Sequence, residues 1–205
     1  MPPQKPLMQH LIIFARHPEL GRVKTRLAAD IGAAAALAVY RQLLAHTRAV
    51  VSPLDVHKTV WLAETPHTPE QADDWTGYEQ LPQPPGDLGQ KMEAAFAHDL
   101  ARGAGKVVII GTDCPGLTTA HIEAAFAALD THDVVVGPAA DGGYYLLGMK
   151  KLYADVFRNK SWSTATVLAE TEADAARFQL RLQRLPELHD IDTGADWRAW
   201  QLAAG

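Results

Sequence analysis

The sequence predicts an α/β domain in which a largely parallel sheet carries helices on both faces. Short apolar or β-branched runs alternate with longer segments of helical periodicity through residues 1–130, which is typical of parallel strands joined by crossover helices. Hydrophobic residues make up 47% and charged residues 21% of the chain, as in ordinary globular proteins. No internal repeat or linker divides the 205 residues, so we expect one domain spanning 1–205.

The first elements follow from short apolar runs and from one glycine. LIIFA at 11–15 is expected to form a buried strand because it is apolar and partly β-branched. Apolar residues recur at helical spacing from 27 to 51, and Gly32 predicts a break into a short and a long helix. The next expected elements are a strand at 56–63, a helix at 68–75 that starts at Thr68-Pro69, and a weaker strand at 78–81.

Capping residues mark most of the later helices. Asp87 is expected to cap a helix that ends before Gly103, and Thr118 or Thr119 suits the cap of another. Thr193 is expected to open the last helix, with Asp196 as its capping partner. The remaining expected elements are strands at 106–110 (KVVII), 134–137 and 144–149, helices at 119–129 and 164–178, and an extended segment at 180–185.

The turn after the first strand is unusually basic. FARHPELGRVKTRLAADIG places Arg16, Lys24 and Arg26 between the strand and the first helix, together with His17 and Arg22. Parallel sheets bind ligands beyond the carboxyl ends of their strands, and Arg and Lys side chains beside a helix start hold phosphate well. The turn therefore indicates a phosphate site, with Lys24 also a candidate catalytic residue. The alternative is a solvated turn whose arginines pair with surface carboxylates. The sequence has neither GxxxxGK[ST] nor GxGxxG here, which excludes these two phosphate motifs.

A carboxylate follows the clearest strand. GTDCPG places Asp113 just beyond KVVII, where a carboxylate suits Mg²⁺ or Mn²⁺ bound together with phosphate oxygens. The alternative is that Asp113 caps the next helix. Cys114 lacks an identifiable base and is interpreted as a small packed residue rather than a nucleophile.

A second pair of carboxylates lies near the end of the chain. In LHDIDTGADW, Asp190 and Asp192 stand two residues apart, so in an extended segment both point the same way and can face one ion. The alternative is that Asp190 is exposed and Asp192 only orients the final helix. Because Thr193 can cap that helix, Asp192 is left for chemistry.

Two further turns combine glycine with an acidic residue. PPGDLGQKM brings Asp87 and Gly89 to a helix start, which suits contact with a nucleotide. PAADGGYYLLG places Asp141 before two glycines, where it can orient an acceptor hydroxyl or act as a general base. The alternative for Asp141 is an ordinary Asp-Gly hairpin turn.

Bulk properties exclude several classes of protein. The net charge of −5 argues against a general nucleic-acid binder. No run approaches the ~18 apolar residues of a membrane span, and the first ten residues lack the apolar core of a secretory signal. With Cys114 as the single cysteine, no intrachain disulfide can form, and we expect a cytoplasmic protein.

Taken together and in order, the quoted stretches and SWST at 161–164 resemble a bacterial nucleotide-diphospho-sugar-transferase-like family, over nearly the whole chain. Some of its members are described as glycosyltransferases, including in arsenosugar biosynthesis. More distantly, the chain is similar to molybdenum-cofactor nucleotidyltransferases and to phospholactate guanylyltransferases, which share a KTRL-like element with 24–27. The resemblance implies the glycosyltransferase-A fold, a three-layer α/β/α sandwich with a mixed, mostly parallel sheet.

The resemblance also implies a divalent metal, Mg²⁺ or Mn²⁺, held by Asp113 and Asp192. Glycosyltransferases of this fold usually carry D-x-D after the middle strand, whereas Asp113-Cys114-Pro115 stands here. The second carboxylate must therefore come from far along the chain, as in the nucleotidyltransferases.

Three functions remain open from the sequence. The first is a metal-dependent glycosyltransferase that uses a nucleotide-diphospho-sugar and a small-molecule acceptor, with Asp141 as the acceptor-side base. The second is a nucleotidyltransferase that joins a nucleoside triphosphate to a phosphorylated small molecule and releases pyrophosphate. The third is a nucleotide-binding regulatory subunit without turnover.

Overall fold

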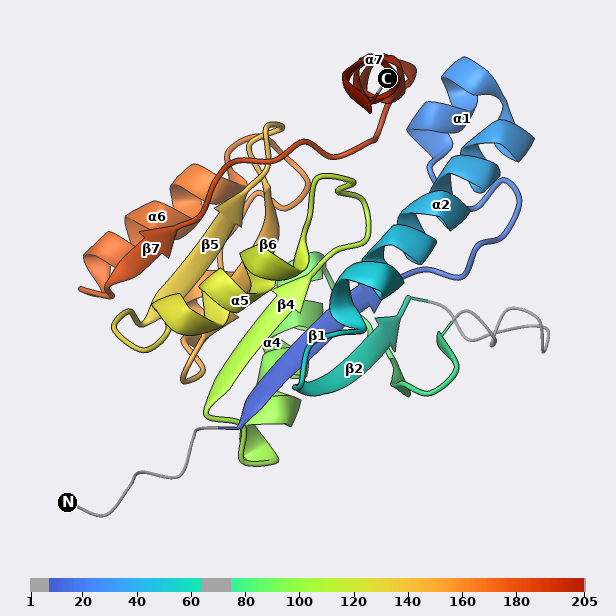
Figure 1. Ribbon diagram of the computed structural model, residues 1–205. Helices are drawn as coiled ribbons and strands as arrows, with labels where there is room; N and C mark the ends of the chain where they lie inside the picture. Colours follow the sequence, from blue (N-terminus) through green and yellow to red (C-terminus); the bar gives the residue numbers. More distant parts are fainter. Residues whose placement is uncertain (1–7, 64–74, 205) are drawn as a thin grey trace.

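A mixed, mostly parallel sheet forms the middle of the molecule (Figure 1). The structure, a computed structural model, describes residues 8–63 and 75–204. In these residues the sheet has seven strands in the order β3-β2-β1-β4-β6-β5-β7. Only β6 runs antiparallel to its neighbours β4 and β5, so the predicted mixed sheet is confirmed. The strands are β1 Gln9–Ala15, β2 His57–Leu62, β3 Glu79–Pro82, β4 Lys106–Ile110, β5 Val134–Pro138, β6 Tyr144–Met149 and β7 Leu182–Arg184.

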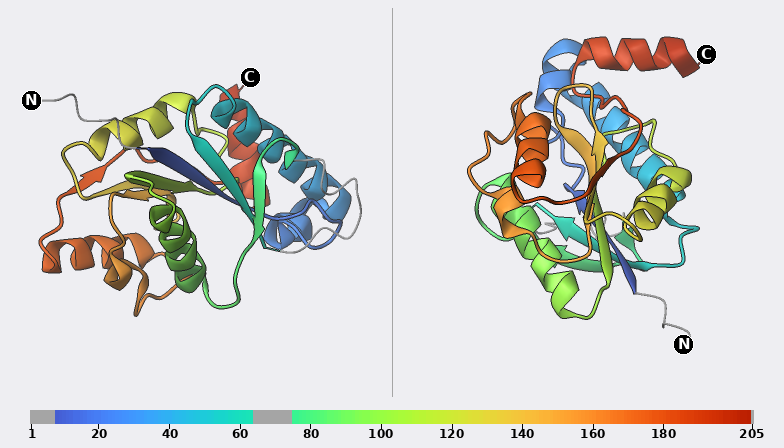
Figure 2. Two further views of the ribbon diagram at one scale, coloured as in Figure 1. Left: turned by 90° about the horizontal axis from the view of Figure 1, so that it is seen from below. Right: turned by 90° about the vertical axis from the view of Figure 1, so that its left-hand side faces the viewer.

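Helices cover both faces of the sheet, as Figure 2 shows from below. Successive side chains of a strand point to opposite faces, and β1 accordingly packs Leu11 and Ile13 against one helical layer and Ile12 against the other. The helices are α1 Thr25–Ile31, α2 Ala33–Val51, α4 Leu88–Ala101, α5 Thr119–Ala128, α6 Val167–Arg177 and α7 Gly194–Ala204, with a short 3₁₀ helix η2 at Ala154–Phe157. Helices α2 and α5 contribute to the first layer, and α4 with η2 to the second. The predicted three-layer α/β/α architecture is thus confirmed.

Local signals placed several element boundaries correctly. Gly32 separates α1 from α2 with a φ of +87°, a conformation that glycine adopts at little cost. Asp87 and Gln90 form a reciprocal capping box at the start of α4, and Thr118 caps α5. Thr193 and Asp196 exchange hydrogen bonds at the start of α7. The helix predicted at 68–75 lies outside the described residues except for Trp75.

The last segment of the chain returns to the carboxyl end of the central strands. Leu188 NH donates to Pro138 O and Ala140 NH donates to Leu188 O, both at 3.0 Å. Ile191 NH then donates to Asp113 O at 3.0 Å, beside the exit of β4. These backbone bonds carry residues 188–192 from the end of β5 across to β4, which brings Asp192 over the turn that leaves β1.

Helix α7 is anchored on α1 (Figure 1). Gly194 NH donates to the Asp30 carboxylate at 2.7 Å, and Ile191 and Trp197 pack with Leu27 of α1. The end of the chain is therefore held against the helix that follows the basic turn. No helix in the described ranges is long and apolar enough to cross a membrane.

Candidate functional site

A cavity of about 650 Å³ opens at the carboxyl ends of β1 and β4, the end of a parallel sheet at which we expected a ligand to bind. Because β6 is antiparallel, its first residue, Tyr144, also lies at this end of the sheet and lines the cavity. The basic turn, the exit of β4 and residues 190 and 192 complete the wall. Segments that are far apart in the sequence thus share one cavity.

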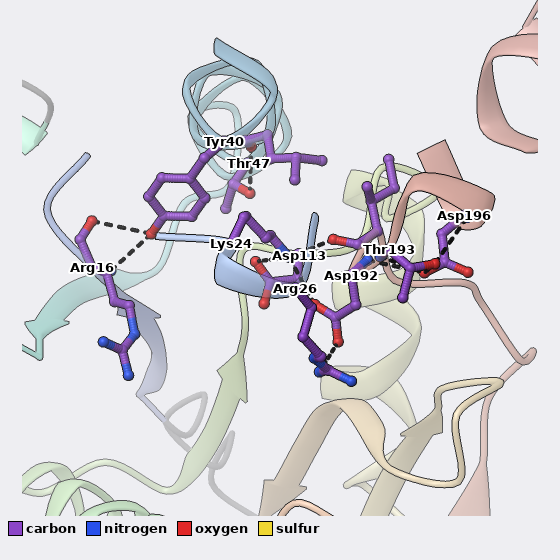
Figure 3. Close-up of polar contacts among 11 residues, drawn as sticks. Arg16, Lys24, Arg26, Tyr40, Thr47, Asp113, Asp192, Thr193 and Asp196 are labelled. Carbon is purple, nitrogen blue, oxygen red and sulfur yellow. Dashed lines mark hydrogen bonds and ion pairs between the residues drawn. The ribbon is translucent and has the colours of Figure 1, made fainter. Parts of the chain in front are cut away.

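Asp113 and Asp192 converge on the ammonium of Lys24 (Figure 3). The Nζ atom lies 2.8 Å from Asp113 Oδ1 and 3.1 Å from Asp192 Oδ1, and it also donates to Ile191 O at 2.6 Å. Burial by itself would lower the pKa of Lys24, but the charges of Asp113 and Asp192 outweigh burial and raise this pKa above its usual value. Lys24 is therefore a charged ammonium in this state.

Arg26 contacts the second oxygen of the same carboxylate (Figure 3). Its Nη2 atom lies 2.6 Å from Asp192 Oδ2, and its side chain is 72% exposed. Asp192 therefore has one oxygen toward Lys24 and the other toward Arg26. Lys24 and Arg26, which were predicted to bind phosphate, are thus both paired with carboxylates here. For Arg26 this is the pairing that the alternative interpretation of the basic turn describes.

Tyr40 of α2 fixes the chain at Arg16, where it leaves β1 (Figure 3). Arg16 NH donates to the Tyr40 hydroxyl at 2.9 Å, and this hydroxyl donates to Arg16 O at 3.0 Å. Burial, followed by the charge of Asp113, raises the pKa of Tyr40 far above its usual value, so the hydroxyl stays protonated. Arg16 thereby has a fixed backbone position at the cavity wall.

Asp190, which is partly buried, and the buried Cys114 lie next to each other in the cavity wall. Burial, and then the charges of Asp113 and Asp141, raise the pKa of Asp190 to about 7, and its Oδ1 atom is buried without a hydrogen-bond partner among the described residues. Burial and the neighbouring Asp190 raise the pKa of the Cys114 thiol to about 12. The thiol is thus protonated at neutral pH, which agrees with its interpretation as a packed residue.

Three predicted site residues do not line the cavity. Asp87 accepts a hydrogen bond from Gln90 NH at 2.9 Å as the α4 cap, and Gly89 is buried where an added Cβ would lie 2.5 Å from Phe157 O. Asp141 accepts from Gly143 NH at 2.9 Å within the turn between β5 and β6, as in the hairpin alternative. Direct ligand contacts of these three residues stay predictions.

The structure adds a cation that sequence reasoning missed. Lys91 lines the cavity together with Leu88 and Met92, because residues three and four positions apart share one face of a helix. Among the described residues no carboxylate pairs with the Lys91 ammonium. The signal was present in the spacing of GDLGQKM after an expected helix cap.

The donor set at Asp113 and Asp192 suits a hard divalent cation. Asp113 Oδ1 and Asp192 Oδ1 both lie within 3.1 Å of the Lys24 Nζ atom. Mg²⁺ takes one or two protein carboxylates when phosphate supplies further oxygens, so the number and kind of ligands agree. Within residues 8–63 and 75–204, no group of three or more His, Cys, Asp or Glu side chains is arranged to hold a metal ion.

Comparison with known proteins indicates a family and a wider fold group. A family model described as "Uncharacterized protein conserved in bacteria (DUF2064)" matches residues 46–164. A protein from Desulfovibrio desulfuricans G20, described provisionally as a nucleotide-diphospho-sugar transferase, is 30% identical with a TM-score of 0.88. The match covers 94% of this chain and 85% of that chain. No curated protein sequence matches this chain.

Two more distant structures share the fold. The inositol-1-phosphate CTP transferase from T. maritima is 12% identical with a TM-score of 0.63, covering 97% of this chain and 96% of that chain. Rv0371c from Mycobacterium tuberculosis H37Rv, in a complex with manganese, is 15% identical with a TM-score of 0.59, covering 94% and 97%. The similar structures thus include a nucleotide-diphospho-sugar-transferase-like protein and a CTP transferase.

Proposed function

This chain belongs to the DUF2064 family, and we propose that it is a metal-dependent transferase that uses a nucleotide-diphospho-sugar donor. The observation that carries the proposal is the convergence of Asp113 and Asp192 on the Lys24 ammonium in the wall of the cavity. Paired carboxylates with arginines and lysines around them are the groups that bind a metal–diphosphate complex. The likeness to the Desulfovibrio protein supports the sugar-nucleotide class.

Each part of the cavity has a proposed role. Arg16 and Arg26 bind the diphosphate, and each charge-assisted hydrogen bond to phosphate contributes about 1.5–3 kcal/mol. Asp113 and Asp192 would hold Mg²⁺ or Mn²⁺, which neutralises charge on a diphosphate leaving group when bound. Asp141 is the proposed acceptor-side base, close enough for its charge to raise the pKa of Asp190.

Asp87 and Gly89 have a proposed indirect role at the start of α4. Asp87 fixes the first turn through its capping box, and Gly89 lets α4 approach Phe157 and Trp162 closely. Together they bring Lys91 to the cavity wall, where its ammonium is available to a phosphate or to another anionic group.

Nucleotidyl transfer is the second candidate. The carboxylates proposed to hold the metal come from distant parts of the chain rather than from a D-x-D sequence, and the T. maritima CTP transferase shares the fold. This enzyme would bind a nucleoside triphosphate and release pyrophosphate. The two candidate functions therefore differ in the class of nucleotide that should protect the protein against thermal unfolding.

A thermal-unfolding screen tests the proposal. Nucleoside triphosphates and nucleotide-diphospho-sugars are each added with and without Mn²⁺. Protection by a nucleotide-sugar that requires Mn²⁺ is the expected result, whereas protection by triphosphates alone favours nucleotidyl transfer. Protection without turnover over a broad set of acceptors would favour the regulatory function.

A pair of variants tests the role of Asp113. Asp113→Ala is expected to abolish the Mn²⁺-dependent part of the protection, because one of the two proposed metal carboxylates is lost. Asp155→Ala is the matched control, since this carboxylate is 62% exposed on η2. Unchanged protection in Asp113→Ala would reject the assigned metal role.

A further inference from the structure

Lys24 occupies the position that a bound cation would take. Its ammonium is surrounded by Ile191 O at 2.6 Å, Asp113 Oδ1 at 2.8 Å and Asp192 Oδ1 at 3.1 Å. The ammonium donates hydrogen bonds to Ile191 O and Asp192 Oδ1 and forms an ion pair with Asp113 Oδ1. The side chain is only 5% exposed, so in this state the ammonium is directed to oxygens of the protein itself.

The ammonium and a divalent ion compete for the same oxygens. A metal ion bound to Asp113 Oδ1 and Asp192 Oδ1 would lie at the position of the Lys24 ammonium. If the ammonium stayed beside the ion, the two positive charges would repel each other strongly. The two therefore exclude each other, and one must leave before the other can bind.

Resting on the proposed function, we propose that Lys24 acts as an internal counter-ion that couples metal binding to diphosphate binding. In the ligand-free protein its ammonium blocks the cation site between Asp113 and Asp192. When a nucleotide diphosphate arrives, the ammonium moves from the carboxylates to a phosphate oxygen, and the divalent ion takes its former place. Metal and nucleotide thus enter together.

The surroundings of Lys24 permit this exchange. Its side chain lines the cavity, so the ammonium can rotate about side-chain bonds into the space where the diphosphate would bind. Arg26 keeps its Nη2 atom on Asp192 Oδ2 and holds this carboxylate in place while Oδ1 changes its partner. A guanidinium has five N–H donors, so the others are left for the proposed contact of Arg26 with the diphosphate. The backbone need not move, because Lys24 O already accepts the first hydrogen bond of α1 from Ala28 NH at 2.8 Å.

The backbone conformation of Lys24 gives independent support. Its φ of 48° and ψ of 46° lie in the left-handed region, which costs a non-glycine residue about 1–2 kcal/mol. A lysine at a helix N-cap also provides no side-chain acceptor for the helix. Neither local property favours lysine here, so the contacts of its ammonium provide the reason for lysine at this position.

Coupling of this kind has a defined thermodynamic sign. Binding of metal alone leaves the Lys24 ammonium without its carboxylate partners, which opposes the binding. A diphosphate supplies new partners and removes this opposition, so each ligand raises the affinity for the other by the same factor. Removing the ammonium should therefore strengthen metal binding in the absence of nucleotide.

Equilibrium dialysis of Mn²⁺ against the whole chain tests this sign. Lys24→Met is expected to bind Mn²⁺ alone at least about tenfold more tightly than the wild type, corresponding to 1.4 kcal/mol or more. Lys24→Asn is a second variant, because asparagine also removes the charge and tolerates the left-handed conformation. Lys91→Met is the charge control for this titration without nucleotide or pyrophosphate, because Lys91 lines the same cavity and forms no ion pair with Asp113 or Asp192.

Inorganic pyrophosphate provides a diphosphate probe that carries no base. With correction for the Mn²⁺–pyrophosphate complex, it is expected to increase protein-bound Mn²⁺ in the wild type and much less in Lys24→Met. Equal Mn²⁺ affinity of the wild type and both Lys24 variants would overturn the proposal. A Lys91→Met variant that gains as much affinity for Mn²⁺ alone as Lys24→Met would also overturn it. If Asp113→Ala still weakens Mn²⁺ binding in that case, only the role of Lys24 is rejected and the proposed function is retained. If Mn²⁺ binding does not depend on Asp113, both proposals are rejected.

Discussion

Replacement of Asp190 by asparagine is expected to stabilise the protein at pH 8 and to have much less effect at pH 5. The pKa of Asp190 is raised from 3.8 to about 7 by burial and by the charges of Asp113 and Asp141. The folded state therefore favours the protonated carboxyl. Its contribution to stability is fully present below pH 4 and is lost as the pH rises through 7.

The magnitude follows from the size of this pKa shift. Each unit corresponds to about 1.4 kcal/mol, so a shift of roughly three units gives an upper bound of about 4 kcal/mol at pH 8. Because Asp190 is not completely enclosed, solvent screening reduces this, and we expect about 2 kcal/mol. At pH 5 the solution is only about one unit above the unfolded pKa of 3.8, so the upper bound falls to about 1.6 kcal/mol. The same screening leaves less than about 1 kcal/mol.

Urea unfolding of the wild type and Asp190→Asn at pH 5, 6, 7 and 8 measures this difference. Asp133→Asn is the matched control, since hydrogen bonds from Arg181 lower the pKa of Asp133 to about 2. Its contribution to stability is lost only between pH 4 and 2, so its effect should be constant from pH 5 to 8. A stability difference for Asp190→Asn that does not grow with pH would refute the reasoning.

Three further substitutions test the site and the fold. Lys91→Ala should reduce nucleotide protection by about 1–2 °C or more in the thermal screen. It should leave the unliganded midpoint nearly unchanged, because the Lys91 ammonium has no carboxylate partner among the described residues. Gly89→Ala should lower the free energy of unfolding by about 2 kcal/mol or more, because its Cβ would lie 2.5 Å from Phe157 O and Trp162. Gly32→Ala should cost about 1 kcal/mol, since its φ is +87° but no atom lies within 4 Å of the added Cβ. Urea unfolding compares the two glycine variants, and equal losses would contradict the steric argument for Gly89.

Several features of the site depend on distances that no sequence pattern records. The charge of Lys24 was correctly recognised, but a positive charge has the same pattern whether it meets a phosphate or two carboxylates. Only the fold brings Asp113 Oδ1 and Asp192 Oδ1 within 3.1 Å of the ammonium. The raised pKa of Asp190 likewise arises from burial and from the neighbouring charge of Asp113. Asp113 and Asp190 lie far apart in the sequence, so no local pattern indicates that their side chains are close.

The alternation of elements and the helix caps were determined by the sequence itself. Gly32, the Asp87–Gln90 box and the Thr193–Asp196 pair depend on residues at most four positions apart, and such interactions leave a local pattern. The meeting of residues 113 and 192 was suggested by resemblance to a family, and the tertiary structure decided it. The physical reason is the backbone bonding of residues 188–191 to the ends of β5 and β4, which carries a distant carboxylate to Lys24.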